Sequence, residues 1–129
     1  MLEVEIVGEL PAALDQAAVE RLATEAAATA DIHDGHLAIE FTDPASIAAL
    51  NEAHRNKRGP TDVLSFPIDG SDLSPAGPRE LGDVVICPEH TADLREALIH
   101  GVLHLVGMDH ETDDGEMLAV QATLLDATR

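Results

Sequence analysis

A chain of 129 residues, 45% of them hydrophobic, is long enough for one compact domain with a real core and too short for two. Its one cysteine excludes an internal disulfide, and no apolar run approaches the about 18 residues that a membrane-spanning helix needs. A formal net charge of −18 argues against a general nucleic-acid binder, because such a surface repels polyanions on average.

Hydrophobic periodicity predicts two strands and two helices in the first half of the chain. Residues 2–8 alternate like a strand. The first ten residues lack the basic segment and apolar run of a secretion signal, so we expect a soluble, cytoplasmic protein with no membrane partner. An aspartate cap followed by an early proline marks the start of the second helix. The expected elements are a strand over 2–8, a helix over 11–30, a strand over 36–42 and a helix from Pro44 to about Arg55.

The second half of the chain reads as two more strands followed by two helices. A segment rich in Pro, Gly, Ser and Asp separates the strands and predicts a loop. The expected elements are a strand over 61–66, a loop over 67–80, a strand over 82–87, a helix over about 91–106 and a helix over 113–127. The order β-α-β-α-β-β-α-α predicts a single α+β domain over residues 1–129, with a mixed sheet of about four strands and packed helices.

Three histidines occur in the segment HGVLHLVGMDH, at the end of the helix expected over 91–106. That helix is apolar over more than half its circumference, so we expect it to be central. His100 and His104 lie one turn apart on the remaining strip, where two imidazoles can converge on one ion. Gly107 would end the helix in a left-handed conformation and let the chain return, so that His110 becomes a third ligand. Three nitrogens leave one position open, which is typical of catalytic zinc.

The same spacing occurs in the metzincin proteases, in the pattern His-Glu-x-x-His-x-x-Gly-x-x-His. Gly101 stands here in place of the glutamate that serves those proteases as general base, which argues against peptide hydrolysis. A glycine inside a helix costs about 1 kcal/mol relative to alanine. Two explanations remain open from the sequence: close packing against a neighbouring element, or room beside the metal for a bulky substrate group such as a phosphodiester.

Three segments, HGVLHLVGMDHE, LNEAHRNKRGPTDVLSFP and LGDVVIC, together resemble the bacterial YbeY family of single-strand-specific metallo-endoribonucleases. The resemblance covers roughly Glu40 to Met117. It implies one Zn²⁺ per chain held by His100, His104 and His110, and a functional arginine at Arg55. It also implies cytoplasmic action on the 3′ end of 16S ribosomal RNA and in ribosome quality control, with ribosomal RNA and the small ribosomal subunit as partners.

This chain departs from the family pattern in two places. Relative to the family, roughly ten residues are missing between the strand ending at Cys87 and the first histidine ligand, which predicts that the metal helix starts late or lacks a preceding turn. Met108 stands where the family usually has tyrosine. Neither change affects a ligand, but both can alter the wall of the cleft and therefore the substrate preference.

Three of the seven basic residues fall within four positions, at Arg55, Lys57 and Arg58. We expect Arg55 to bind the scissile phosphate through its guanidinium group, with Lys57 and Arg58 as further substrate contacts. The alternative for Arg55 is a favourable interaction with the dipole at the C-terminal end of its helix. The alternative for Lys57 and Arg58 is that both are solvated loop residues.

No general base can be identified from the sequence. Asp109 and Glu111 flank the third ligand and can orient an imidazole, although surface carboxylates are common at helix ends. Ser65 is expected to line the cleft or to be an ordinary strand serine. The 2′-hydroxyl of RNA and a metal-activated water both remain possible nucleophiles.

Three functions therefore compete. The first is a zinc-dependent, single-strand-specific endoribonuclease acting on ribosomal RNA. The second is a zinc peptidase-like hydrolase, favoured by the histidine spacing and disfavoured by Gly101. The third is a non-catalytic ribosome assembly factor in which the metal is structural.

Overall fold

The computed structural model describes residues 2–69, 79–109 and 111–128. Within these ranges the elements follow the predicted order. They are β1 (Leu2–Val7), α1 (Gln16–Ala28), β2 (Gly35–Phe41), α2 (Pro44–Arg55), β3 (Val63–Pro67), β4 (Glu80–Ile86), a short 3₁₀ helix (Pro88–His90), α3 (Leu94–Leu105) and α4 (Glu116–Ala127).

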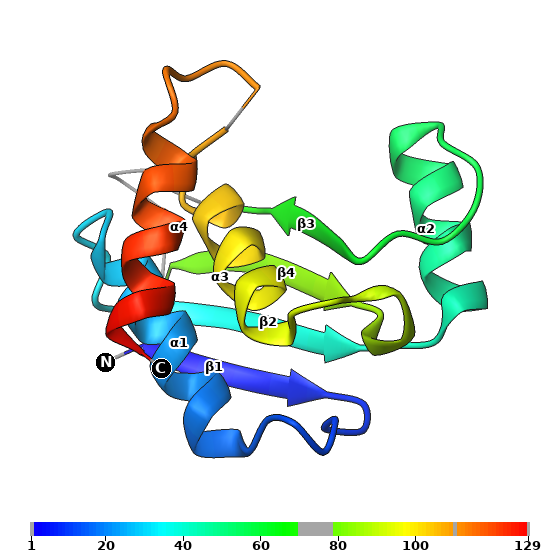
Figure 1. The fold of residues 1–129 in the computed structure, drawn as a ribbon, viewed down its shortest axis with the longest axis horizontal. Coiled ribbons are helices and arrows are strands. Elements are labelled where there is room, and N and C mark those ends of the chain that lie inside the picture. Colours follow the sequence, from blue (N-terminus) through cyan, green and yellow to red (C-terminus); the bar gives the residue numbers. More distant parts are fainter. Residues whose placement is uncertain (1, 70–78, 110, 129) are drawn as a thin grey trace.

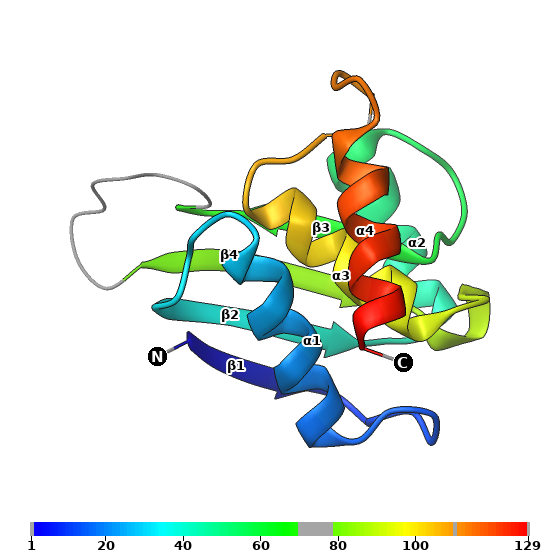
Figure 2. The ribbon, with the colours of Figure 1, turned by 60° about the vertical axis from the view of Figure 1, so that its left-hand side comes forward.

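The four strands form one mixed sheet in the order β1-β2-β4-β3. The pairs β1–β2 and β2–β4 are parallel, whereas β3 runs antiparallel to β4. Two helices, α1 and α3, cover one face of this sheet, and α4 packs on α3 (Figures 1 and 2). The predicted α+β class and mixed four-stranded sheet are therefore confirmed.

The main hydrophobic core lies between the sheet and these helices, and it takes residues from β1, β2, β4 and all three helices. A smaller core lies on the opposite face, where Ile47 of α2 packs with Leu64, Val85 and Cys87. Neighbouring residues along a strand face opposite sides of a sheet, so β3 and β4 contribute to both cores. As a result, α2 and α3 lie on opposite faces of the same edge of the sheet.

Three helix starts differ from the sequence-based expectation. The simplest case is α4, which was expected to start at 113 and begins at Glu116. Asp15 accepts a hydrogen bond from the N–H of Ala18 at 2.7 Å and caps α1 there, while Pro11 to Leu14 form a turn. The cap therefore decides the start of α1, although the alanine-rich pattern begins five residues earlier. A similar cap at Asp93, which accepts from the N–H groups of Arg95 and Glu96, delays the start of α3 to Leu94. The 3₁₀ helix before it was not expected.

No helix in the described part of the chain is both long and apolar enough to cross a membrane. Of the predicted loop between β3 and β4, residues 70–78 lie outside the described residues.

Candidate active site

The centre of the candidate site is α3, which is packed against the sheet, α1 and α4 (Figure 2). Seven of its twelve residues are buried, as the apolar pattern of the sequence predicts. His100 and His104 occupy the partly buried strip that remains, and both line a cleft at the edge of the sheet.

Gly101 sets how closely α3 approaches the sheet. A Cβ atom at this position would lie 2.4 Å from Cγ1 of Val84 in β4 and 3.2 Å from Cγ2 of Val63 in β3. The residue faces the sheet, so its missing side chain brings helix and sheet together. Of the two readings open from the sequence, close packing is the one that the structure supports.

Gly107 ends α3 as predicted. Its φ of 100° lies in the left-handed region, which glycine adopts without strain. The N–H of Gly107 donates to the carbonyl of His104, and the N–H of Met108 donates to that of Leu103, both at 3.1 Å. This pair of bonds is the Schellman motif, which reverses the chain after a helix. The chain is therefore turned back immediately after the second histidine, as the ligand hypothesis requires.

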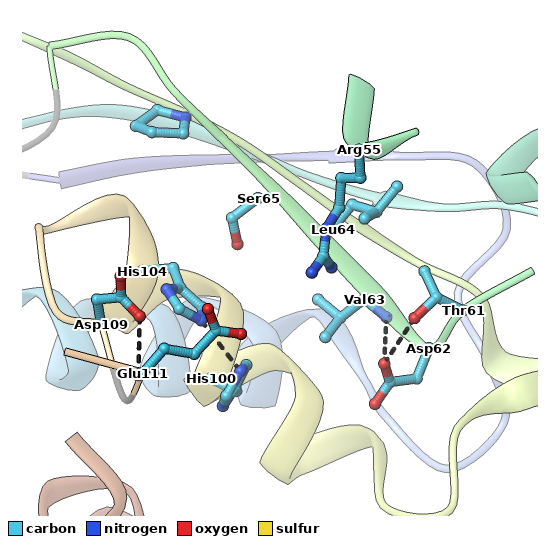
Figure 3. A pocket seen from close by; sticks show the side chains of 11 residues that line it. Arg55, Thr61, Asp62, Val63, Leu64, Ser65, His100, His104, Asp109 and Glu111 are labelled. Atoms are coloured by element: carbon cyan, nitrogen blue, oxygen red, sulfur yellow. Dashed lines mark hydrogen bonds between the residues drawn. The ribbon is translucent and has the colours of Figure 1, made fainter. Parts of the chain in front are cut away.

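The two histidines of α3 point their Nε2 atoms toward one another. These atoms are 3.2 Å apart, and the rings cross at 78° (Figure 3). On its other side, Nδ1 of His100 donates a hydrogen bond of 2.8 Å to Oε1 of Gln121 in α4. The pair is thus held by a contact with a second helix.

Strand β3 forms the opposite wall of the cleft, which has a volume of 340 Å³. Arg55, the last residue of α2, extends past this strand toward the histidine side (Figure 3). Because β3 is the edge strand, a residue from one face of the sheet can meet residues from the other face here. The residues that line the cleft are Arg55, Thr61, Asp62, Val63, Leu64, Ser65, Pro67, His100, His104, Asp109 and Glu111.

The loop after Arg55 is tied back onto α2. Asn56 takes a left-handed conformation, and the buried side chain of Asn51 donates to the carbonyl of Gly59 at 3.0 Å. Lys57 and Arg58 are exposed on this loop and do not line the cleft, so substrate contact by these two residues stays a prediction.

Ser65 lines the cleft, and its hydroxyl donates a hydrogen bond of 2.9 Å to the carbonyl of Gly101. This bond ties β3 to α3, so the serine has a structural role at the site. Asp109 also has a structural partner, because its carboxylate accepts the N–H of Glu111 at 2.9 Å (Figure 3). Both Asp109 and Glu111 line the cleft, and the orientation of an imidazole by either residue stays a prediction.

Three polar residues of the site were missed in the sequence. Thr61 and Asp62, just before β3, line the cleft, and Asp62 accepts the N–H of Val63 at 2.8 Å. Gln121 interrupts the apolar face of α4 between Met117 and Leu125, which are both buried. A glutamine at a position that should be apolar was the signal that could have found it.

The donor set fits a zinc ion as far as the described residues extend. Two nitrogens that share a tetrahedral zinc at about 2.0–2.1 Å lie about 3.3–3.4 Å apart, close to the 3.2 Å between the two Nε2 atoms. The third expected ligand, His110, lies outside the described residues. Among the residues that the structure does describe, no group of three His, Cys, Asp or Glu side chains is placed to hold a metal.

Known proteins resemble this chain over nearly its whole length. The family model described as Endoribonuclease YbeY matches residues 7–129. The Endoribonuclease YbeY of Beutenbergia cavernae is 38% identical over 143 aligned residues, covering 96% of this chain and 95% of that protein. That of Clavibacter sepedonicus is 36% identical and covers 96% and 94%. A solution structure from Thermotoga maritima superposes with a TM-score of 0.57 at 28% identity, covering 97% of this chain and 88% of that one.

Proposed function

The chain belongs to the Endoribonuclease YbeY family, and from this membership and the geometry of the cleft we propose that it is a zinc-dependent endoribonuclease specific for single-stranded RNA. Its proposed substrate is the 3′ region of 16S ribosomal RNA, cleaved in the cytoplasm during maturation and quality control of the small ribosomal subunit. The observation that supports this most directly is the position of Arg55, whose guanidinium group reaches across the edge strand toward a pair of histidines (Figure 3).

We assign the metal to His100 and His104, together with His110. A zinc ion bound there would supply Lewis-acid chemistry to the scissile phosphate. The imidazoles are held by α3, which is fixed against the sheet at Gly101, so the donors are organised before substrate arrives.

Arg55 is the residue that we assign to the phosphate. Cleavage of a phosphodiester increases the negative charge on the nonbridging oxygens, and a guanidinium group can donate two parallel hydrogen bonds to them. In a chain of net charge −18, this local cation also offsets the general repulsion of RNA. The loop that follows Arg55 is held against α2 by the hydrogen bond from Asn51 to the carbonyl of Gly59.

The backbone of β3 offers a second donor. The backbone N–H of Cys87 donates to the carbonyl of Asp62 at 2.9 Å, and the backbone N–H of Ile68 donates to the carbonyl of Leu81 at 3.0 Å. The even-numbered residues of β3 therefore form the backbone hydrogen bonds with β4. The N–H of Ser65 therefore points away from β4, toward the open edge that lines the cleft. It would bind a phosphate or sugar oxygen there without needing a charge.

Among the described residues, the carboxylates that line the cleft and can accept the proton of the attacking hydroxyl are those of Asp62, Asp109 and Glu111. An extended single strand can lie along the open edge of β3, whereas a rigid duplex cannot bend into a cleft of 340 Å³. We infer the preference for single strands from this shape.

The test is cleavage of matched single-stranded and double-stranded RNA from the 16S 3′ region by protein with measured zinc content. Cleavage of the single strand that stops after chelation, returns with zinc and is lost in His104→Ala would support the proposal. Digestion of casein in place of RNA would support the peptidase. Zinc and ribosome binding without either activity would support an assembly factor with a structural metal.

A further inference from the structure

Gln121 is a polar residue in an apolar interface. Its side chain is only 8% exposed, and the residues one turn before and after it on α4, Met117 and Leu125, belong to the main core. An amide buried at such a position is stable only when its polar atoms are hydrogen-bonded. The side chain of Gln121 forms a hydrogen bond with His100, which lines the cleft.

That bond fixes the protonation of His100. The acceptor is Oε1 of Gln121, and an amide oxygen has no proton to donate, so Nδ1 of His100 must carry the hydrogen over the 2.8 Å contact. In a neutral imidazole the other nitrogen then carries the lone pair. This other nitrogen is Nε2, the atom that faces Nε2 of His104 at 3.2 Å.

We propose that Gln121 is a positioning residue for the metal centre, which selects the tautomer and ring orientation in which His100 binds zinc through Nε2. The inference rests on the proposed metal site. It goes beyond it because it gives α4, which contributes no proposed ligand, a defined part in metal affinity. Partners of this kind commonly fix metal-ligating histidines, and their loss typically weakens binding about 10–100-fold.

The chemistry of the partner matters as well as its position. An amide oxygen orients the ring without placing a negative charge beside the metal. A carboxylate at the same position would keep the hydrogen bond and make the imidazole a stronger donor. The inference therefore predicts different zinc affinities for two substitutions of nearly equal size, Gln121→Met and Gln121→Glu.

The experiment measures the zinc dissociation constant by competition with a chromophoric chelator, in wild type and in both variants. We expect Gln121→Met to weaken zinc binding about 10–100-fold and Gln121→Glu to bind at least as tightly as wild type. In metal-free wild type, ¹⁵N NMR of the histidine side chains should show Nδ1 of His100 protonated. Thermal unfolding of the metal-free proteins records any loss of stability separately.

Leu125→Ala is the matched control, because it removes a buried side chain from the same face of α4 and keeps Gln121, the residue that bonds His100. It should lower the unfolding temperature and leave the zinc constant within twofold. The inference is overturned if wild type binds zinc and Gln121→Met leaves its affinity unchanged, or if NMR finds Nδ1 of His100 unprotonated. If Gln121→Met does not fold, the tautomer of His100 in the wild type and the zinc dissociation constant of Gln121→Glu still test the inference. Wild-type protein that binds no zinc would overturn the metal centre itself.

Discussion

Replacing Gly101 with alanine should push α3 and the sheet apart. The added Cβ would lie 2.4 Å from Cγ1 of Val84, which is fully buried and cannot turn into solvent. Overpacking of this kind costs about 1–3 kcal/mol, and the better helix propensity of alanine returns about 1 kcal/mol. We therefore expect a net loss of up to about 2 kcal/mol in the free energy of unfolding, although alanine alone would stabilise a free helix.

A double-mutant cycle with Val84→Ala isolates the contact. Val84→Ala removes two of the three methyl groups that the new Cβ would meet, including the closest, and leaves Cγ2 of Val63 in place. The double variant should therefore be more stable than the sum of the single effects by about 1–3 kcal/mol. Urea unfolding in the presence of a chelator gives the four free energies. Far-UV circular dichroism is the suitable probe, because the chain has no tryptophan or tyrosine.

Ala119→Gly, at an exposed position of α4, measures the free-energy difference between alanine and glycine in a helix of this protein. It therefore gives the propensity gain to be subtracted for Gly101→Ala. If the effects of Gly101→Ala and Val84→Ala add within about 0.5 kcal/mol, Gly101 is not needed for close approach and the packing explanation is wrong.

Arg55→Ala should lower RNA cleavage about 10²–10³-fold with zinc affinity and urea midpoint unchanged, and Arg55→Lys should restore it only in part; cleavage at the wild-type rate would contradict the phosphate role. Burial alone lowers the pKa of His36, but its hydrogen bonds to Glu80 at 2.6 Å and Glu5 at 3.0 Å outweigh this and raise the pKa above the ordinary value of 6.5. The stabilisation that protonated His36 gains from these two carboxylates is therefore fully present below about pH 6.5 and is lost as the pH rises through the raised pKa. His36→Gln should lower the free energy of unfolding more at pH 5.5 than at pH 9, and an equal loss at both would refute this assignment. Ser65→Ala should lower the free energy of unfolding by about 1 kcal/mol, measured by urea unfolding, because β3 loses its side-chain bond to α3; no loss would show that this bond does not stabilise the pair.

Local chemistry in the sequence predicted the helix ends best. An aspartate cap and proline gave the start of α2, and Gly107 gave the end of α3, because each of these signals acts through the backbone within a few residues. The start of α1 was placed too early because alanine-rich composition continues through the turn before Asp15. There the competing signal was also local, and the cap outweighed propensity.

The cleft depends on contacts that no local pattern contains. Strand β4 inserts between β2 and β3, and this pairing alone makes β3 the edge and lets Arg55 face the histidines. Gln121 was overlooked for a related reason. Hydrophobic periodicity identifies the apolar residues of a buried helix face and gives no signal for a polar residue between them. Its partner, His100, lies 21 positions away in another helix.

Because β3 is at the edge of the sheet, its free backbone edge lies between the two sides of the cleft. A second polypeptide hydrogen-bonding along that border would run between Arg55 and the imidazoles. Self-assembly through β3 and turnover of RNA would therefore exclude one another. Strand β1, at the far border, is the place where a reporter or affinity tag can be fused without obstructing catalysis (Figure 1).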